Sequence, residues 1–441
     1  MAAFELDAVV LATDELSLVR IAGLTARERA SRVAAKVGAT RVHVVERVDD
    51  DELARWRAGR SCPLLVIRAD QLVHTPLVAP LIEALPTLDR DGVAIAVVPD
   101  APVVQDLPPG SYAGALLATG RGADDVIAGL ADDTALVARL VEPRRVPHGP
   151  IARAPIATAE QRRQAHRVLY RILIKPQDNA ITRYLYRPVS FPLTRLLVWT
   201  PITPNQISYV VAVLVALGCW LTAHASFNMV LLGTIVVLAA SYVDCCDGEV
   251  ARVKLLSSRF GAWIDTVVDE LSSVGYMVAL GWHCHEHFGP SFFGELPVDP
   301  WKLAIAISVV TYLWSIYCVY YNIIVAVGSA NSQDYVGRFE VVPGSAPNTV
   351  RLAPAAAKAI ATKEPLPPWL DFIATYAPYI VRRDFIAWAS VLLAALHVTH
   401  LSFGLLAAGG LVSAAILTID HLKLRSLRRS IERRGLLLDA P

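Results

Sequence analysis

The chain has 441 residues, of which 54% are hydrophobic and only 18% are charged. This composition is too apolar for an ordinary soluble protein and predicts that part of the chain lies in lipid. The formal net charge of +1 indicates neither nucleic acid nor an acidic partner. The six cysteines are scattered and contain no CxxC pair, so the sequence predicts neither a disulfide framework nor a zinc site.

Residues 1–145 show the alternation of short elements that is typical of an α/β domain. β-rich runs such as 7–13 and 64–70 alternate with amphipathic stretches such as 26–38. We expect a parallel sheet flanked by helices. Acidic residues stand where a signal peptide would carry basic ones, so this domain is expected to stay in the cytosol.

Residues 146–200 are expected to connect this domain to the rest of the chain. They begin with a linker rich in Pro and Arg, and at 159–199 Arg and Lys alternate with Leu, Tyr, Phe and Trp. Such a basic amphipathic helix can lie along lipid headgroups with its apolar face down. The alternative is a helix that packs only on the protein.

Residues 201–435 are expected to form an all-α membrane domain. Apolar runs there approach or exceed the roughly 20 residues that cross a bilayer. The six candidate spans are residues 206–224, 227–243, 260–283, 301–327, 383–400 and 402–420.

Basic residues gather on one side of these spans. They are frequent before residue 200 and at 423–434, whereas the connectors 222–226 and 285–300 contain no Lys or Arg. By the positive-inside rule, both termini and the ends of the second and third spans face the cytosol. In a bacterium this would be the plasma (inner) membrane.

Four aspartates stand at those cytosolic ends: Asp244, Asp247, Asp265 and Asp269. The first two are three residues apart and the last two are four apart, so each pair lies on one face of a helix. Four carboxylates so close cannot all remain ionised at a membrane edge unless cations neutralise them. Oxygen-only ligands suit Mg²⁺ or Mn²⁺ and predict a metal site.

The same helix faces carry small residues and an arginine. Gly248, Ala251 and Gly261 remove side-chain bulk, and Arg252 offers a planar fork to phosphate oxygens. A pair of metals with an arginine is suited to displacement at phosphorus. A transporter that binds ions through its carboxylates is the alternative from another class. The location of all four aspartates at one membrane face, and the lack of an internal repeat, argue against it.

These residues resemble the signature of the CDP-alcohol phosphotransferase family at every fixed position. The matching residues, at fixed spacing across two helices, are Asp244, Asp247, Gly248, Ala251, Arg252, Gly261, Asp265 and Asp269. The resemblance implies a six-helix membrane enzyme, a homodimer, that uses two Mg²⁺ or Mn²⁺ ions. Such enzymes transfer a phospho-alcohol from a CDP-alcohol to a second alcohol and release CMP.

The resemblance also implies roles for single residues. Asp244, Asp247 and Asp265 would bind metal, and Asp269 would take the proton of the acceptor and lie near a metal. The CDP site would be lined by Gly248, Ala251, Arg252 and Gly261. The segment TPITPNQIS (200–208) is similar to the family's TPN segment, so Asn205 would also touch the nucleotide; a helix-start role after Pro204 is the alternative.

A second resemblance concerns the order of the domains. Residues 173–208 look like the region before the first span in di-myo-inositol-phosphate-phosphate synthases, where a nucleotidyltransferase-like domain precedes the phosphotransferase. Residues 64–85 resemble the nucleotidyltransferase segment that carries a metal-binding aspartate, here Asp70. The glycine-rich phosphate loop is missing after the first strand, so we expect an inactive domain in which Asp70 is an ordinary strand-end residue.

The resemblances leave the substrates open. The first interpretation is a phospholipid-forming enzyme with CDP-diacylglycerol as donor and a polyol or polyol phosphate as acceptor. The second keeps the chemistry but uses the soluble donor CDP-inositol. Two other groups of residues are left as surface features: the histidines at 283–287 as an exposed loop rather than a metal site, and the basic residues Arg338, Arg351, Lys358 and Lys363 as either a pocket cap or a solvated loop.

Overall fold

The computed structural model describes residues 5–174, 178, 180–328, 334–344, 346, 348–354 and 383–439. The chain divides into two compact units. The first contains Met1–Asp178, Phe191–Thr203 and Gly248–Ser257, and the second contains Asn179–Ser190, Pro204–Asp247 and Ser258–Pro441. The predicted boundaries of three domains stay a prediction.

The first unit is built on a six-stranded sheet. In spatial order its strands are β4 (Arg41–Val45), β1 (Asp7–Leu11), β5 (Leu64–Arg68), β8 (Tyr112–Ala118), β7 (Val93–Val97) and β9 (Arg144–Pro147). β1 is parallel to both of its neighbours, whereas β8 is antiparallel to β5 and β7. The expected parallel sheet is therefore wrong, and the sheet is mixed. The cause is the direct return from β7 to β8, which needs no helical crossover.

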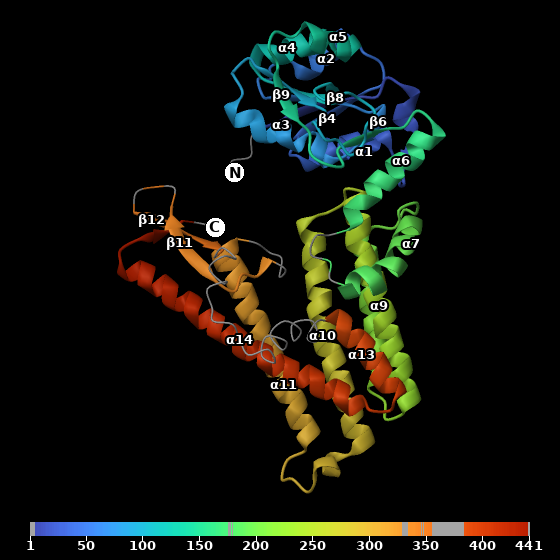
Figure 1. Cartoon of the computed structure of the whole chain (residues 1–441), viewed down its shortest axis with the longest axis vertical. Helices are drawn as coiled ribbons and strands as arrows, with labels where there is room; N and C mark the ends of the chain where they lie inside the picture. Colours follow the sequence, from blue (N-terminus) through green and yellow to red (C-terminus); the bar gives the residue numbers. More distant parts are fainter. Residues whose placement is uncertain are drawn as a thin grey trace. The chain divides into compact units, whose positions relative to one another are not determined.

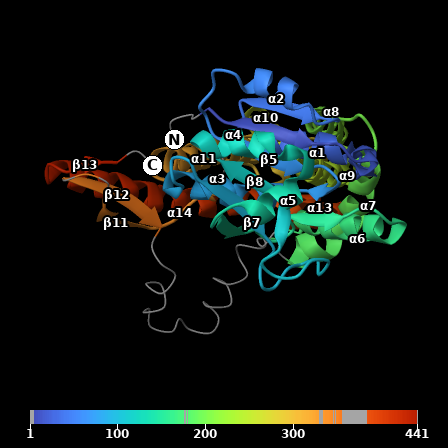
Figure 2. The same cartoon turned by 90° about the horizontal axis from the view of Figure 1, so that it is seen from above.

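Helices cover both faces of this sheet, as Figure 1 shows, and Figure 2 gives the view from above. One face carries α1 (Ala26–Lys36) and α3 (Ala79–Ala84), and the other carries α2 (Asp50–Arg57), α4 (Gly120–Ala128) and α5 (Asp133–Arg139). Each face buries its own apolar cluster. Helix α1 begins with a capping box between Thr25 and Glu28. The α/β architecture expected from the sequence is confirmed.

Helix α6 (Ala159–Tyr170) follows the α/β part and belongs to the same unit. It packs against strand β10 (Arg153–Pro155) and buries Ala165, Val168 and Leu169. Part of the apolar face of α6 is thus covered by protein, and the two alternatives for residues 159–199 as a whole stay predictions. The following helix, α7 (Arg187–Leu197), leaves Leu196 exposed.

The second unit is mainly helical. Its helices are α8 (Pro204–Thr222), α9 (Phe227–Val253), whose last residues belong to the first unit, α10 (Arg259–Phe288), α11 (Pro300–Asn322), α13 (Arg383–Ala395) and α14 (Thr399–Arg433). Each of the six candidate spans overlaps mainly with one of them, and the span 383–400 runs past the end of α13 into the start of α14. Four helices of the described residues are long and apolar enough to cross a membrane: α8, α9, α11 with its extension to Val327, and α14. Six spans are not confirmed, because α10 carries several charges and α13 is short.

Helix α10 packs against α8, α11 and α14. Helices α8 and α9 approach closely where Gly233 faces Thr222, since a Cβ on Gly233 would lie 2.6 Å from the Thr222 backbone nitrogen. A three-stranded sheet of β11 (Phe339–Pro343), β12 (Thr349–Pro354) and β13 (Leu437–Leu438) was not expected from the sequence. Arg351 lies in β12, and Lys358 and Lys363 lie outside the described residues.

Candidate active site

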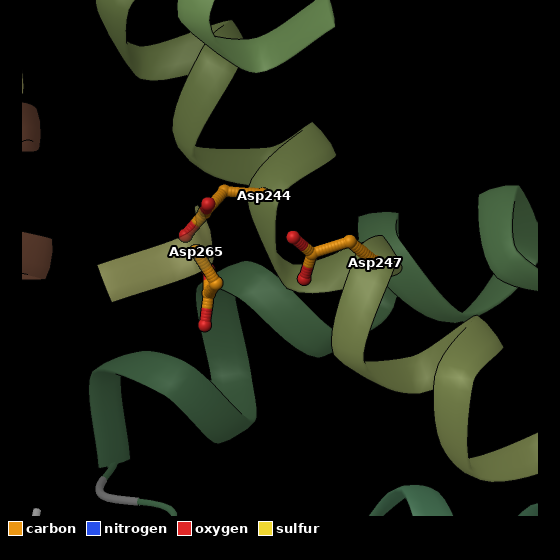
Figure 3. Close-up of side chains that lie close together, drawn as sticks. All are labelled: Asp244, Asp247 and Asp265. Carbon is orange, nitrogen blue, oxygen red and sulfur yellow. The ribbon is translucent and has the colours of Figure 1, made fainter. Parts of the chain in front are cut away.

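Three of the four predicted aspartates meet in one place. Helix α9 carries Asp244 and Asp247, and helix α10 carries Asp265. One carboxylate oxygen from each of the three lies within 4.8 Å of the others. Figure 3 shows these side chains gathered between the two helices. The helical spacing predicted from the sequence therefore brings carboxylates of both helices together.

Local hydrogen bonds hold this cluster. Asp247 is buried, and its Oδ2 accepts a 2.6 Å hydrogen bond from Ser208 Oγ of α8. Helix α10 begins at an N-cap, where Ser258 Oγ accepts from the backbone N–H of Gly261 at 2.9 Å. Ser208 of α8 thus holds the Asp247 carboxylate directly, and the N-cap at Ser258 fixes the start of the helix that carries Asp265.

The donor set fits a divalent cation. Three carboxylates within 4.8 Å of one another repel each other when ionised, and a cation between them removes that repulsion. All three donors are oxygen atoms, which hard cations prefer. In the part of the chain that the structure describes, this is the only group of three such side chains placed to hold a metal ion.

Asp269 lies one helical turn beyond Asp265 on α10 but is not part of the cluster of three. With Asp244 it lines a cavity of about 250 Å³ within the second unit. Hydroxyl groups line the same cavity, from Ser241, Ser272, Ser273, Ser315 and Ser413. A ligand with hydroxyl groups in this cavity would therefore lie near the carboxylates of Asp244 and Asp269.

The small residues of the motif make room for specific neighbours. A Cβ on Gly261 would lie 2.9 Å from Asn205 Oδ1, so only glycine allows Asn205 to approach α10 this closely. On α9, a Cβ on Gly248 would lie 3.3 Å from Nη1 of Arg252, whose side chain runs back along the helix. Ala251 lies on the same helix and is half-buried. The grouping of Asn205 with Gly261 is thus a feature of the structure.

Two polar residues of this region were missed by sequence reasoning. Ser208 had no signal, because a serine near the start of a helix is common. Asp384 opens α13 and lines the cavity, and its Oδ2 accepts from Thr182 Oγ1 at 3.0 Å. A lone acid at the start of an apolar run was a usable signal for Asp384.

Two secondary candidates are also placed. The histidines expected in an exposed loop lie within α10, and His283 is fully buried, with its ring nitrogens bonded to His224 O and Thr399 Oγ1. The loop expectation is therefore wrong for His283. Asp70 follows β5 and pairs with the guanidinium of Arg68.

Comparison with known proteins agrees with this geometry. The model of the CDP-alcohol phosphatidyltransferase family matches residues 201–362, which include every motif residue. The chain is 35% identical over 129 residues to a bifunctional IPC transferase and DIPP synthase of Aquifex aeolicus, and 31% identical over 128 residues to one of Thermococcus kodakarensis. It is also 34% identical over 87 residues to an archaetidylinositol phosphate synthase of Pyrococcus horikoshii.

These matches are local. The match to the Aquifex protein covers 29% of this chain and 29% of that protein. The match to the Thermococcus protein covers 29% of this chain and 28% of that protein. The match to the Pyrococcus protein covers 18% of this chain and 42% of that protein. The chain thus matches less than a third of the length of the two bifunctional relatives. Within that limit the matched region, the motif and the carboxylate cluster agree, and residues 201–362, less than half of the chain, match the model of the CDP-alcohol phosphatidyltransferase family.

Proposed function

We propose that the chain is a membrane CDP-alcohol phosphotransferase. It would transfer a phospho-alcohol from a CDP-alcohol to the hydroxyl of a polyol or polyol phosphate and release CMP. The observation that carries the proposal is the cluster of Asp244, Asp247 and Asp265 within a domain of this family. The four apolar helices support a location in a membrane.

The three clustered carboxylates would hold Mg²⁺ or Mn²⁺, with two ions and Asp269 as a further ligand. Bound metal would neutralise the phosphates of the donor. Asp269 would accept the proton of the attacking hydroxyl, whose oxygen bonds to the β-phosphorus while the bond from that phosphorus to the oxygen of CMP breaks. Arg252, with Gly248, Ala251, Gly261 and Asn205, would bind the CDP group.

The donor is proposed to be CDP-diacylglycerol or a similar lipid, which would make the chain an enzyme of phospholipid biosynthesis. The name archaetidylinositol phosphate synthase of one relative supports a lipid product. The second candidate is soluble CDP-inositol, and the names IPC transferase and DIPP synthase favour it. The cavity is lined by serine hydroxyls together with apolar side chains such as Val211, Met277 and Leu405, so its lining favours neither donor.

The assembly and orientation are further parts of the proposal. We infer that both termini and the active site lie on the cytosolic side, because the basic connectors lie at that end of the helices. A homodimer is proposed only from the family resemblance. Residues 1–145 would be a nucleotidyltransferase-like domain without activity. Residues 146–200 would link it to the phosphotransferase domain, residues 201–435.

The test is CMP release by the purified protein in lipid nanodiscs with Mg²⁺ or Mn²⁺. CDP-diacylglycerol and CDP-inositol are offered in parallel, each with inositol phosphate as acceptor. Turnover of the lipid donor identifies a phospholipid synthase, and turnover of CDP-inositol alone identifies the second candidate. If neither donor releases CMP and the protein instead carries ions across a vesicle membrane, the transporter interpretation replaces the enzyme.

A further inference from the structure

The connector between α9 and α10 is part of the first compact unit. Residues Gly248–Ser257 belong to this unit together with the α/β part and the segment Phe191–Thr203. The connector joins the helix of Asp244 and Asp247 to the helix of Asp265. Contacts that fix the connector can therefore influence the distance between the two helices that carry the carboxylates.

Helix α1 of the α/β part holds this connector with two cationic side chains. Arg32 Nη1 donates a 2.8 Å hydrogen bond to the backbone oxygen of Lys254, and Lys36 Nζ donates a 3.0 Å hydrogen bond to that of Ser257. The two donors are four residues apart on α1, so they reach the connector from one face of the helix. Hydrogen bonds from charged donors are stronger than those between neutral groups.

The connector also contributes an apolar anchor. Leu255 packs against the hydrophobic cluster on the α1 face of the sheet. Its φ of 56° lies in the left-handed region, which is unfavourable for a residue with a Cβ. Such a conformation persists where surrounding contacts fix it. The contacts with α1 and with the cluster supply that fixation.

Lys254 extends the same network to the segment before α8. Its side chain is buried, and its ammonium donates to the backbone oxygens of Thr200 and, at 3.2 Å, Ile202. Desolvation, with a smaller contribution from the charge of Arg32, lowers the pKa of Lys254. Because a buried cation needs such acceptors, residues 200–202 and the connector are held together.

These contacts converge on the start of the helices that build the site. The segment 200–202 leads into α8, where Ser208 bonds to Asp247. The connector leads into α10 and therefore into Asp265. The α/β part thus holds the connector immediately before α10 through Arg32 and Lys36, and the connector in turn holds the segment before α8 through Lys254.

We propose that Arg32 and Lys36 are positioning residues for the cluster of Asp244, Asp247 and Asp265. The α/β part would then serve the membrane domain by fixing the connector, so that the carboxylates stand at the spacing that a divalent cation needs. This inference deepens the proposed function and rests on it for the activity measurement alone. Metal binding and connector mobility test it separately.

The experiment uses the full chain in nanodiscs and compares wild type with the double variant Arg32→Ala/Lys36→Ala. Three quantities are measured: direct Mn²⁺ binding, the Mn²⁺ concentration that gives half-maximal CMP release, and hydrogen–deuterium exchange of amides 254–258. We expect Mn²⁺ affinity to fall on the order of fivefold and connector exchange to accelerate. The rate of CMP release at saturating Mn²⁺ should change less than the half-saturation value.

Matched variants separate positioning from general destabilisation. Arg27 lies on the same helix as Arg32 and Lys36 and forms an exposed ion pair with Glu46, which follows β4. Arg27→Ala removes this ion pair and should leave all three quantities unchanged. Arg32→Lys keeps the charge and should restore part of the Mn²⁺ affinity. If the double variant fails to fold, the single variant Lys36→Gln, at an exposed position, carries the test.

Unchanged exchange of the connector together with Mn²⁺ affinity within twofold of wild type would overturn the inference. So would an equal effect of Arg27→Ala. If the wild-type protein binds Mn²⁺ but releases no CMP from either donor, the proposed function fails while binding and exchange still decide the positioning role. If wild type binds no Mn²⁺, connector exchange alone decides whether α1 holds the connector, and positioning of a metal site is refuted.

Discussion

The substitution Gly261→Ala tests the site most sharply. A Cβ at this position would lie 2.9 Å from Asn205 Oδ1 and 3.1 Å from Ser258 Oγ. The first distance is too short for a real contact, so the Asn205 side chain has to move away. Because Asn205 Oδ1 is at the end of a flexible side chain, this movement costs the fold little but displaces a group that we assign to the CDP site.

The expected effects on stability and activity therefore differ. A weakened N-cap at Ser258 costs about 1 kcal/mol, and replacing a helical glycine by alanine gains roughly 0.8–1.0 kcal/mol, so the free energy of unfolding should change little. Loss of one hydrogen bond to the nucleotide costs about 1–1.5 kcal/mol, which corresponds to roughly a five- to tenfold fall in kcat/KM. The assay is CMP release over a range of CDP-alcohol concentrations.

Gly275→Ala is the matched control, because it makes the same exchange on the same helix. Its Cβ would lie 3.5 Å from Cys219 Sγ, an ordinary contact, so activity should be kept. Asn205→Ala should reproduce the loss, and the double variant with Gly261→Ala should lose little more, since both changes remove one interaction. Full activity of Gly261→Ala, or an equal loss in Gly275→Ala, would refute the assignment of Asn205.

Three further predictions follow from single contacts. Asp269→Asn should lower the rate of CMP release by about 10²-fold or more. Its Mn²⁺ affinity should fall far less than that of Asp265→Asn. An equal loss of Mn²⁺ affinity in the two variants would make Asp269 mainly a metal ligand. Ser208→Ala removes the 2.6 Å bond to Asp247 and should weaken Mn²⁺ binding roughly fivefold; unchanged binding would show that this bond does not position the carboxylate. Arg153→Met removes the 2.7 Å hydrogen bond from Arg153 Nε to Oε1 of the buried Gln71 and should lower the free energy of unfolding of the α/β part by about 1–3 kcal/mol, measured by urea denaturation; a change below about 0.5 kcal/mol, the scale of an ordinary surface substitution, would contradict it.

The sequence predicted the carboxylate cluster because the cluster depends on local geometry. Residues three and four apart on a helix share a face whatever the rest of the fold does, so Asp244 and Asp247 had to lie together. Placing Asp265 against them required only that the next helix return antiparallel. The role of Gly261 as space for Asn205 was not readable, because the two residues are far apart in the sequence and belong to different helices.

The sequence predicted where strands occur better than whether neighbouring strands run parallel or antiparallel. Runs rich in Val and Ile identified β1, β5 and β7, whereas β8 reads YAGALLA and has no β-branched residue. Its antiparallel pairing depends on partners distant in sequence. Likewise, Arg32 and Lys36 look like solvated charges of an amphipathic helix, and only the structure shows that the backbone of residues 254 and 257 accepts their hydrogen bonds.

The α/β part can now be interpreted through its own charges. Asp70 stands after β5, at the strand end where α/β proteins commonly bind ligands. Arg68 pairs with it, and Arg68 Nη1 also lies 3.6 Å from Asp133 Oδ1. The hydrogen bond with Asp70 raises the pKa of Arg68, so the guanidinium remains charged at any physiological pH.

The guanidinium of Arg68 already neutralises the negative charge of Asp70 and Asp133, which would otherwise attract a metal ion. This arrangement favours the structural interpretation of Asp70 over a metal ligand, in line with the missing glycine-rich loop. The contacts of α1 with the connector suggest a different use for the same domain, because α1 holds the connector that leads into α10. On the proposal made above, the α/β part would act on the carboxylate cluster through the connector rather than through a metal of its own.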